Sequence, residues 1–372
     1  MGGGRGGIRA SQWPPLLDAA RASWLHGALL SMPCYPTPVR RCDALSNARA
    51  ELWVKNDGLS HPRYGGSKVR KAGPLIAQAL ERGARRVLSF GAVGSHHLLT
   101  LTLFARAAGL ESAGVVFSQP HTEHAVETLR VSLGLGFEPC VATHPTLIPW
   151  ALARALRRGD YVIAPGGSNA IGTRACAAAI DELAEQVAEG ALPIPDVIVV
   201  PLGSGGTCAG LAAGVVRRNW PSRVLGVQVV SGPGPRWLAR WLARGALREA
   251  GLTARMAALD TCLTFDTTQV GRAYGAATVA GEQATAVARE ECDLELDPTY
   301  TGKAFASVLE LLASATPLRA SRDAGPARIL YWHTLNARSL EPELRTAPSE
   351  TELPPSLRRL FTRPVRTGRT GA

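Results

Sequence analysis

Short hydrophobic runs alternate with longer stretches of helical periodicity along most of this chain. Largely apolar runs of three to seven residues predict strands, and the periodic stretches between them predict helices. The predicted strands are 87–90, 114–117, 161–163, 196–200, 224–230 and 329–332. The predicted helices are 98–108, 124–133 and 169–187. Strands that alternate with helices imply right-handed crossovers and helices on both faces of a mostly parallel sheet, which is an α/β fold.

Length and composition refine this picture. A chain of 372 residues is longer than one ordinary core, so two domains are expected. Hydrophobic residues make up 46% and charged residues 19%, which is typical of a globular chain. The formal net charge of +11 is carried mostly by arginines spread over predicted helices and the C-terminal tail. Because no aromatic residues are interleaved with them and no nucleic-acid motif occurs, we expect no nucleic-acid partner.

One uncharged segment needs a separate interpretation. The nineteen residues 87–105 carry no formal charge, a length that nominally suits a membrane helix. Gly91, Gly94 and Ser95 interrupt the segment, so a strand, a loop and a helix explain it better. We therefore predict no membrane association.

The cysteine pattern indicates a compartment. The seven cysteines are scattered, odd in number and free of C-x-x-C spacing. That pattern favours reduced thiols and a cytoplasmic protein. The segment 1–5 also lacks the apolar core of a signal peptide.

A glycine cluster follows the predicted strand 196–200. Its residues are Gly203, Ser204, Gly205, Gly206 and Thr207. Small residues let backbone N–H groups approach a phosphate, and the next helix directs its positive end at the anion. No lysine follows the glycines, so this is not a Walker motif, and the loop does not fit G-x-G-x-x-G with an acidic residue about twenty positions later. A phosphate cradle and a tight packing turn both remain open at this point.

Lys68 follows a second glycine pair, Gly65 and Gly66. A lysine that forms a Schiff base must lose its proton, which burial and cationic neighbours such as Arg70 and Lys71 promote. A solvated lysine at a helix start is the simpler interpretation of Lys68 alone. Together with the downstream phosphate cradle, however, this amine indicates a single cofactor, pyridoxal phosphate (PLP).

Two further loops carry small residues at predicted helix starts. In 91–97, Gly94 and Ser95 precede a helix and can bind a substrate carboxylate. His96 and His97 are adjacent, whereas two metal ligands on a helix need a spacing of four, so we predict no metal site. The loop 165–169 predicts a capped helix and a hinge between domains.

The order of these motifs resembles a known enzyme family. The chain is similar to the D-cysteine desulfhydrase and 1-aminocyclopropane-1-carboxylate (ACC) deaminase family, among the tryptophan synthase β-like, fold-type II PLP enzymes. The resemblance runs from about Pro36 to about Thr334, most of the chain. The matching segments are 52–55, 64–71, 91–97, 166–169, 203–210 and 297–303.

The resemblance implies a role for each site residue. Lys68 would bind PLP as its internal aldimine, and Tyr300 would transfer protons. Ser95 would contact the substrate carboxylate, and Thr301 would hydrogen-bond the pyridine nitrogen. His96 stands where relatives have an asparagine beside the cofactor's 3-hydroxyl, so it is expected at both cofactor and substrate. The phosphate would be held by Ser204, Gly205, Gly206 and Thr207.

The resemblance also implies an architecture. It consists of two open, twisted, mostly parallel sheets flanked by helices, with PLP in the cleft between two domains. The large domain would comprise 13–70 and 168–341, and the small domain 71–167 would be inserted in it. Residues 1–12 and 342–372 are expected to be flexible tails. Homodimerisation is expected from the family.

The expected reaction follows from position 301, where ACC deaminases typically have glutamate and desulfhydrase-like relatives have threonine. A threonine hydroxyl cannot balance a protonated pyridine, so the ring would be a weaker electron sink. We therefore predict β-elimination from a small, D-cysteine-like amino acid, which gives pyruvate, ammonia and the leaving group. Ser67, Leu335 and Asn336 depart from the family pattern. β-Replacement, racemisation, ACC deamination or a non-catalytic PLP-binding protein are the alternatives.

Overall fold

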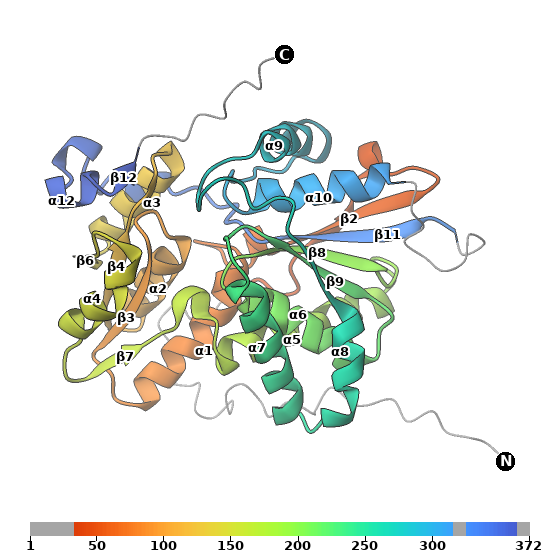
Figure 1. The fold of residues 1–372 in the computed structure, drawn as a ribbon, viewed down its shortest axis with the longest axis horizontal. Coiled ribbons are helices and arrows are strands. Elements are labelled where there is room, and N and C mark those ends of the chain that lie inside the picture. Colours follow the sequence, from red (N-terminus) through yellow and green to blue (C-terminus); the bar gives the residue numbers. More distant parts are fainter. Residues whose placement is uncertain (1–32, 315–324, 363–372) are drawn as a thin grey trace.

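The computed structural model describes residues 33–314 and 325–362, and the predicted tail 1–12 lies outside these ranges. Two sheets of different size lie side by side, each flanked by helices (Figure 1). The predicted α/β fold class is confirmed.

The larger sheet has six strands in the order β1-β2-β11-β8-β9-β10. Its strands are β1 (Val39–Arg41), β2 (Ala50–Asn56), β8 (Val197–Leu202), β9 (Arg223–Gln228), β10 (Leu263–Asp266) and β11 (Ala327–His333). All neighbours pair in parallel except β1 and β2, which are antiparallel. Every residue of β8 is buried, which explains its continuous run of apolar residues.

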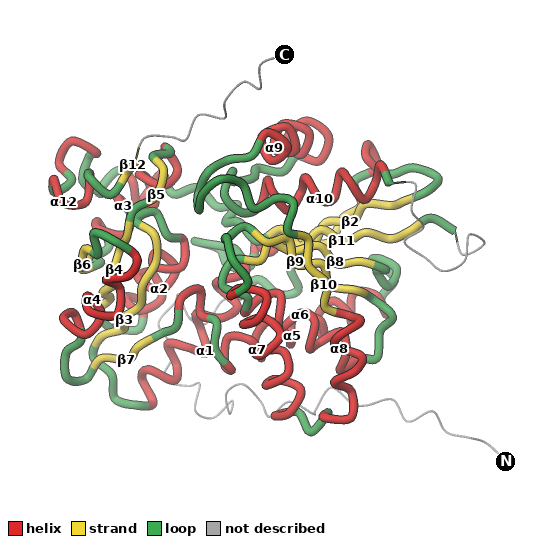
Figure 2. Tube along the Cα trace, in the orientation of Figure 1, coloured by secondary structure: helices red, strands yellow, loops and turns green. Residues whose placement is uncertain are grey.

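Helices cover both faces of this sheet (Figure 2). One face carries α5 (Ala170–Ala188), α6 (Gly206–Arg218), α7 (Gly234–Glu249) and α8 (Met256–Cys262). The other carries α9 (Val279–Cys292) and α10 (Thr301–Ala313). Successive residues of β8 serve opposite cores, because Ile198 packs toward α6 and Val199 toward α10.

The smaller sheet has four parallel strands in the order β6-β4-β3-β7. Its strands are β3 (Arg86–Ala92), β4 (Glu111–Phe117), β6 (Glu138–Val141) and β7 (Asp160–Val162). On one face lie α2 (His96–Ala107) and α3 (Glu123–Gly134), and on the other lies α4 (Ile148–Ala155). The helix α1 (Ser67–Glu81) contacts α2 and α5 and so joins the two halves. The predicted domain boundary at 70/71 falls inside α1.

The segment 342–362 is ordered, so the prediction of a flexible tail is wrong there. It contains most of α11 (Glu341–Leu344), α12 (Pro355–Arg358) and β12 (Phe361–Thr362). β12 pairs in parallel with β5 (Gln119–Pro120). Leu353, Leu357 and Leu360 are buried against the small domain. Their apolar contacts are non-local, so a local sequence rich in proline and arginine gave no signal. Residues 363–372 lie outside the described ranges.

The prediction of reduced thiols is also wrong for one cysteine pair. Cys42, after β1, and Cys292, the last residue of α9, form a disulfide across a sequence separation of 250 residues. Only the packing of α9 on the large sheet brings them together. The cysteines therefore no longer support the expectation of a cytoplasmic protein.

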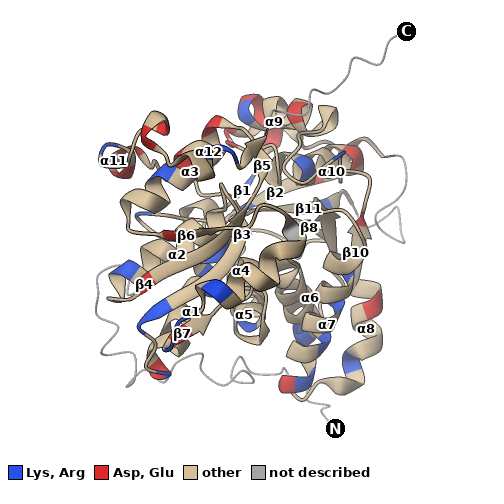
Figure 3. Ribbon diagram, turned by 60° about the vertical axis from the view of Figure 1, so that its left-hand side comes forward, with Lys and Arg blue, Asp and Glu red and all other residues tan. Residues whose placement is uncertain are grey.

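Lysine and arginine residues occur on several elements rather than one (Figure 3). Many are paired within the fold, as where Arg86 meets Asp160 at 2.8 Å and Arg218 meets Asp181 at 2.6 Å. The absence of a nucleic-acid partner stays a prediction. Among the described helices, none is both long and apolar enough to cross a membrane.

Candidate active site

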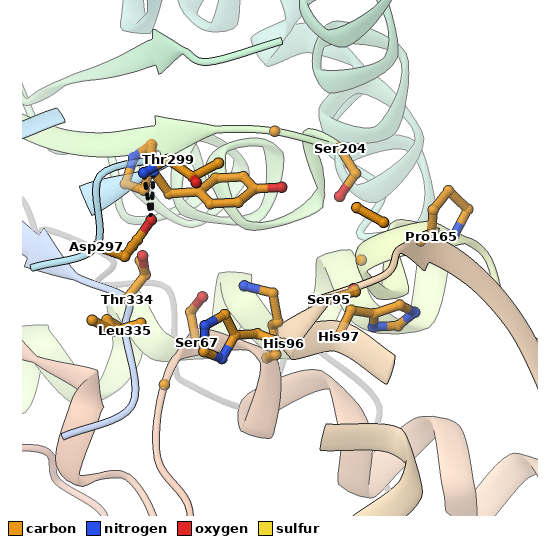
Figure 4. Close-up of a pocket in the computed structure, with 18 of the residues that line it drawn as sticks. Ser67, Ser95, His96, His97, Pro165, Ser204, Asp297, Thr299, Thr334 and Leu335 are labelled. Atoms are coloured by element: carbon orange, nitrogen blue, oxygen red, sulfur yellow. Dashed lines mark hydrogen bonds between the residues drawn. The ribbon is translucent and has the colours of Figure 1, made fainter. Parts of the chain in front are cut away.

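A cavity of about 470 Å³ lies between the two sheets. It is lined by the start of α1 and by loops that follow β3, β8 and β11, where ligands of parallel sheets bind. Figure 4 shows Ser204 and Pro165 at one end of the cavity, and Asp297 and Leu335 at the other. The structure thus gathers residues from five predicted motifs around one space.

Lys68 is the second residue of α1 and lines this cavity. The helix is preceded by Gly66, whose φ of +104° favours glycine and whose Cβ would lie 2.8 Å from the carbonyl oxygen of Thr334. The Lys68 Nζ atom lies 5.6 Å from the centre of the Tyr300 ring. Burial, and then the charge of Lys71, lowers the pKa of Lys68 from 10.5 to about 8. Its amine is therefore easier to deprotonate than that of an ordinary lysine.

The glycine loop after β8 leads directly into α6, which begins at Gly206. Gly205 has a φ of +94°, which favours glycine. Three of the four predicted phosphate ligands line the cavity, namely Ser204, Gly205 and Thr207. Gly206 instead donates its N–H to Ser168 Oγ at 3.0 Å, and Ser168 donates to Ser204 Oγ at 2.8 Å. Ser168 therefore holds the glycine loop through hydrogen bonds to Ser204 and Gly206.

Tyr300 is placed in the cavity by Asp297. One carboxylate oxygen, Oδ1, accepts the backbone N–H groups of Thr299 at 2.9 Å and Tyr300 at 2.7 Å. The phenol oxygen lies 2.5 Å from that of Tyr274. Burial, and then the neighbouring Tyr274, raises the pKa of Tyr300, so its hydroxyl stays protonated. A Cβ on Gly203 would lie 2.8 Å from the Tyr300 ring, so the ring packs directly on this glycine.

The predicted contact of Thr301 with the cofactor ring finds no support in the structure. Thr301 is buried and is not part of the cavity lining among the described residues. Its hydroxyl donates to Asp297 Oδ2 at 2.6 Å. The Thr301 hydroxyl is therefore already hydrogen-bonded to the carboxylate of Asp297. The family pattern alone did not indicate this pairing.

His96 lines the cavity, but both of its ring nitrogens have partners inside the protein. Nδ1 lies 2.7 Å from the Tyr64 hydroxyl, and Nε2 lies 2.6 Å from Nε2 of His124. Burial, followed by His124 and Lys68, lowers the pKa of His96 well below 6.5, so the ring is neutral. Ser95, the N-cap of α2, lines the same wall. Its predicted contact with a substrate carboxylate stays a prediction.

Four other lining residues were not among the predicted site residues. Lys71, named from the sequence only as a cationic neighbour of Lys68, donates to the carbonyl oxygen of Gly166 at 2.6 Å. Tyr274 belongs to an irregular loop without a motif, and Tyr64 and His124 contact His96. Tyr64 and Lys71 stand in the Lys68 segment 64–71, whereas Tyr274 and His124 stand in no recognised motif.

The departures from the family pattern after β11 have a structural role. Leu335 lines the cavity beside Thr334. Asn336 Oδ1 accepts the backbone N–H of Gly65 at 2.7 Å, and its Nδ2 donates to the Arg338 carbonyl at 2.6 Å. Asn336 therefore fixes the glycine pair that precedes Lys68.

A model of the pyridoxal-phosphate dependent enzyme family matches residues 30–334 of this chain. With the fold and the lysine-containing cavity described above, this match shows that the chain belongs to that family.

Individual relatives span several reactions. The chain is 31% identical over 327 residues to nocardicin C-9′ epimerase of Nocardia uniformis subsp. tsuyamanensis, covering 84% of this chain and 94% of that protein. A crystal structure of an ACC deaminase homologue matches with a TM-score of 0.69 and 26% identity, over 89% of this chain and 100% of that one. The L-serine ammonia-lyase of Rhizomucor miehei shares the fold at 17% identity, with a TM-score of 0.58 and coverage of 83% and 96%.

The protein is therefore PLP-dependent, and the cavity residues fit this cofactor. Lys68 supplies a partly buried amine of lowered pKa, and Ser204, Gly205 and Thr207 supply a small-residue cradle at the start of a 13-residue helix. PLP, when bound, supplies an electron sink for reactions at the α-carbon of an amino acid.

Proposed function

We propose that this enzyme removes and returns the α-proton of an amino acid. The observation that carries the proposal is the placement of Lys68 beside Tyr300 in one cavity, 5.6 Å from its ring. The Lys68 amine has a lowered pKa and so suits a proton acceptor near neutral pH, whereas Tyr300 holds its proton and suits a donor. The basic lining residues Lys68 and Lys71 favour a substrate carboxylate.

Epimerisation or racemisation is the reaction we favour. It needs only removal of the α-proton and its return to the opposite face, without a leaving group. The 31% identity to nocardicin C-9′ epimerase, over most of both chains, supports this choice.

β-Elimination from a small D-cysteine-like amino acid is the second candidate, and it would release pyruvate, ammonia and the leaving group. The structural likeness to an ACC deaminase homologue at 26% identity supports it. The alternative of a non-catalytic PLP-binding protein is disfavoured by the complete lysine–tyrosine pair. A homodimer with a small amino-acid substrate remains part of the proposal.

One experiment separates these candidates. The PLP-loaded protein is incubated with single D- and L-amino acids in D₂O, including cysteine, serine and ACC. Proton NMR and chiral chromatography follow the α-position, while pyruvate and ammonia are measured in parallel. We expect deuterium at the α-carbon and formation of the opposite enantiomer. Pyruvate without inversion would instead establish elimination.

Two variants serve as controls in that experiment. Lys68→Ala should abolish either reaction. Arg289→Ala, which removes an exposed ion pair with Glu295, should leave it unchanged. A protein that loses no α-proton from any tested amino acid would contradict the proposal.

A further inference from the structure

The small-domain wall of the cavity contains a second hydrogen-bonded group of ionisable side chains. His124 belongs to the first turn of α3, His96 begins α2, and Tyr64 precedes α1. All three line the cavity. Nε2 of His124 meets Nε2 of His96 at 2.6 Å, and Nδ1 of His96 meets the Tyr64 hydroxyl at 2.7 Å.

The distances indicate that a proton, and not a metal ion, joins the two histidines. Two imidazole nitrogens bound to one tetrahedral zinc would be roughly 3.3 Å apart, given zinc–nitrogen bonds of about 2.0–2.1 Å. The observed separation is 2.6 Å. Moreover, the described residues contain no group of three or more side chains suited to a metal.

The neutral state of His96 limits how protons can be arranged along the hydrogen-bonded series His124–His96–Tyr64. A neutral imidazole has one donor and one acceptor nitrogen. If His96 donates through Nδ1 to Tyr64, its Nε2 accepts the Nε2–H of His124. In this arrangement His124 carries a lone pair on Nδ1.

In this arrangement, Nδ1 of His124 can accept a proton from a ligand in the cavity. Within the described ranges it has no hydrogen-bond partner, and the residue is only partly buried at the cavity wall. A proton accepted there would give an imidazolium whose other N–H remains bonded to His96. His97, the other histidine of the motif, forms a hydrogen bond with Ser89 Oγ at 3.0 Å and does not belong to the hydrogen-bonded series His124–His96–Tyr64.

The large-domain wall carries another proton-transfer group, the Tyr300–Tyr274 pair, and Lys68 lies between the two walls at the start of α1. Tyr300 precedes α10 of the large domain, whereas His96 and His124 belong to small-domain helices. An amino acid in the cavity therefore lies between two separate sets of proton carriers. Such an arrangement suits epimerisation, because the proton leaves one face of the α-carbon and returns to the other.

We propose that His124 is a second catalytic residue, which exchanges the α-proton on one face while Lys68 and Tyr300 serve the other. His96 and Tyr64 are positioning residues that fix the tautomer of His124. One C–H bond breaks at one wall and one forms at the other, so the product is the epimer of the substrate. Each wall recovers its protonation state by exchange with water. This inference rests on the proposed function.

Replacement of His124 by glutamine tests the inference. A glutamine keeps a hydrogen bond to His96 but cannot carry a proton. The loaded wild-type enzyme should exchange the α-proton of both enantiomers of its substrate with D₂O. His124→Gln should slow exchange of one enantiomer by at least about 10²-fold and leave the other near wild type. His96→Asn should slow the same enantiomer, by about tenfold.

Two measurements exclude an effect on folding or binding. His144→Gln, at an exposed histidine of the small domain, should behave as wild type. The affinity of His124→Gln for an α-methyl amino acid, which has no α-proton, should be unchanged by calorimetry. Melting temperatures of His124→Gln and His124→Asn confirm that both variants fold.

Imidazole ¹⁵N NMR of the cofactor-free protein gives a readout that does not depend on turnover. We expect a neutral His96 hydrogen-bonded to His124, and a change in the His124 signals in His96→Asn. Independent imidazole signals, or equal slowing of both enantiomers, would overturn the inference. If the wild type exchanged neither enantiomer, the proposed function would fail with it, whatever the NMR result.

Discussion

The two walls of the cavity present different chemical groups: backbone groups on the large-domain side and side chains on the small-domain side. The large-domain wall consists of a glycine loop, a helix start and a tyrosine placed by backbone hydrogen bonds to Asp297. The small-domain wall presents side chains, among them Ser95, His96 and His124. Backbone groups at a helix start hold an anion in a fixed place, whereas imidazoles can accept and donate protons.

This difference separates two tasks. Changes in the large-domain wall should alter how tightly PLP is held, and changes in the small-domain wall should alter which reaction follows. Lys68 lies where the walls meet, at the start of the helix that contacts both α2 and α5. It should therefore affect both tasks at once.

Lys68→Ala tests that position and should give the largest effect. Without the amine, both covalent attachment of PLP and proton removal are lost. We expect turnover to fall by at least about 10³-fold, with loss of the absorbance band of covalently bound PLP. Absorbance spectra and α-proton exchange measure both. A variant that retained the band would show that another lysine binds PLP.

Loss of the disulfide should destabilise the large domain while leaving the small-domain wall intact. A disulfide that closes a long loop restricts the unfolded chain, so Cys42→Ser should lower the free energy of unfolding by about 2–5 kcal/mol. Urea denaturation measures this, and titration of free thiols should show five in the unfolded wild type, since seven cysteines less two bonded leaves five. Seven free thiols would contradict the bond.

Gly205→Ala should weaken PLP binding without changing the reaction. Gly205 has a φ of +94°, and an added Cβ would lie 3.1 Å from the backbone nitrogen of Ala239. The resulting strain of at least about 1 kcal/mol should raise the PLP dissociation constant at least about fivefold. Gly245→Ala is the matched control, because that helical glycine has open space around its Cβ position. Equal affinities of the two variants would argue against a cradle at 203–207.

The smallest expected effect is a shift in pH dependence. Only the neutral amine of Lys68 reacts with an aldehyde, and its pKa is lowered to about 8. Capture of PLP by the cofactor-free protein should therefore accelerate as pH rises toward 8 and level off above it. Stopped-flow absorbance measures the rate. A rate that still rose near the ordinary lysine pKa of 10.5 would show that the amine is not perturbed.

The two walls also differ in how far the sequence predicted them. The strand before the glycine loop and the helix after it were predicted from contiguous residues, and the structure has β8 and α6 there. Lys68 and Tyr300 likewise stand in continuous motifs. Local patterns suffice because each of these residues stands in one contiguous segment at a helix start.

Local sequence patterns could not predict the contacts between residues that are far apart in the sequence. His96 and His124 are 28 residues apart in sequence, and Tyr274 and Tyr300 are 26 apart. The Cys42–Cys292 bond and the pairing of β12 with β5 link still more distant segments. Each depends on how α2, α3, α9 or the C-terminal segment packs, which no motif encodes.

Reductive trapping tests the central claim most directly. Borohydride fixes PLP covalently to the lysine that holds it, and peptide mass spectrometry then identifies that lysine. Two lysines, Lys68 and Lys71, line the cavity in the described structure, so the result discriminates between near neighbours. We predict that the label is found on Lys68. A label on Lys71, or on a lysine away from the cavity, would contradict the account.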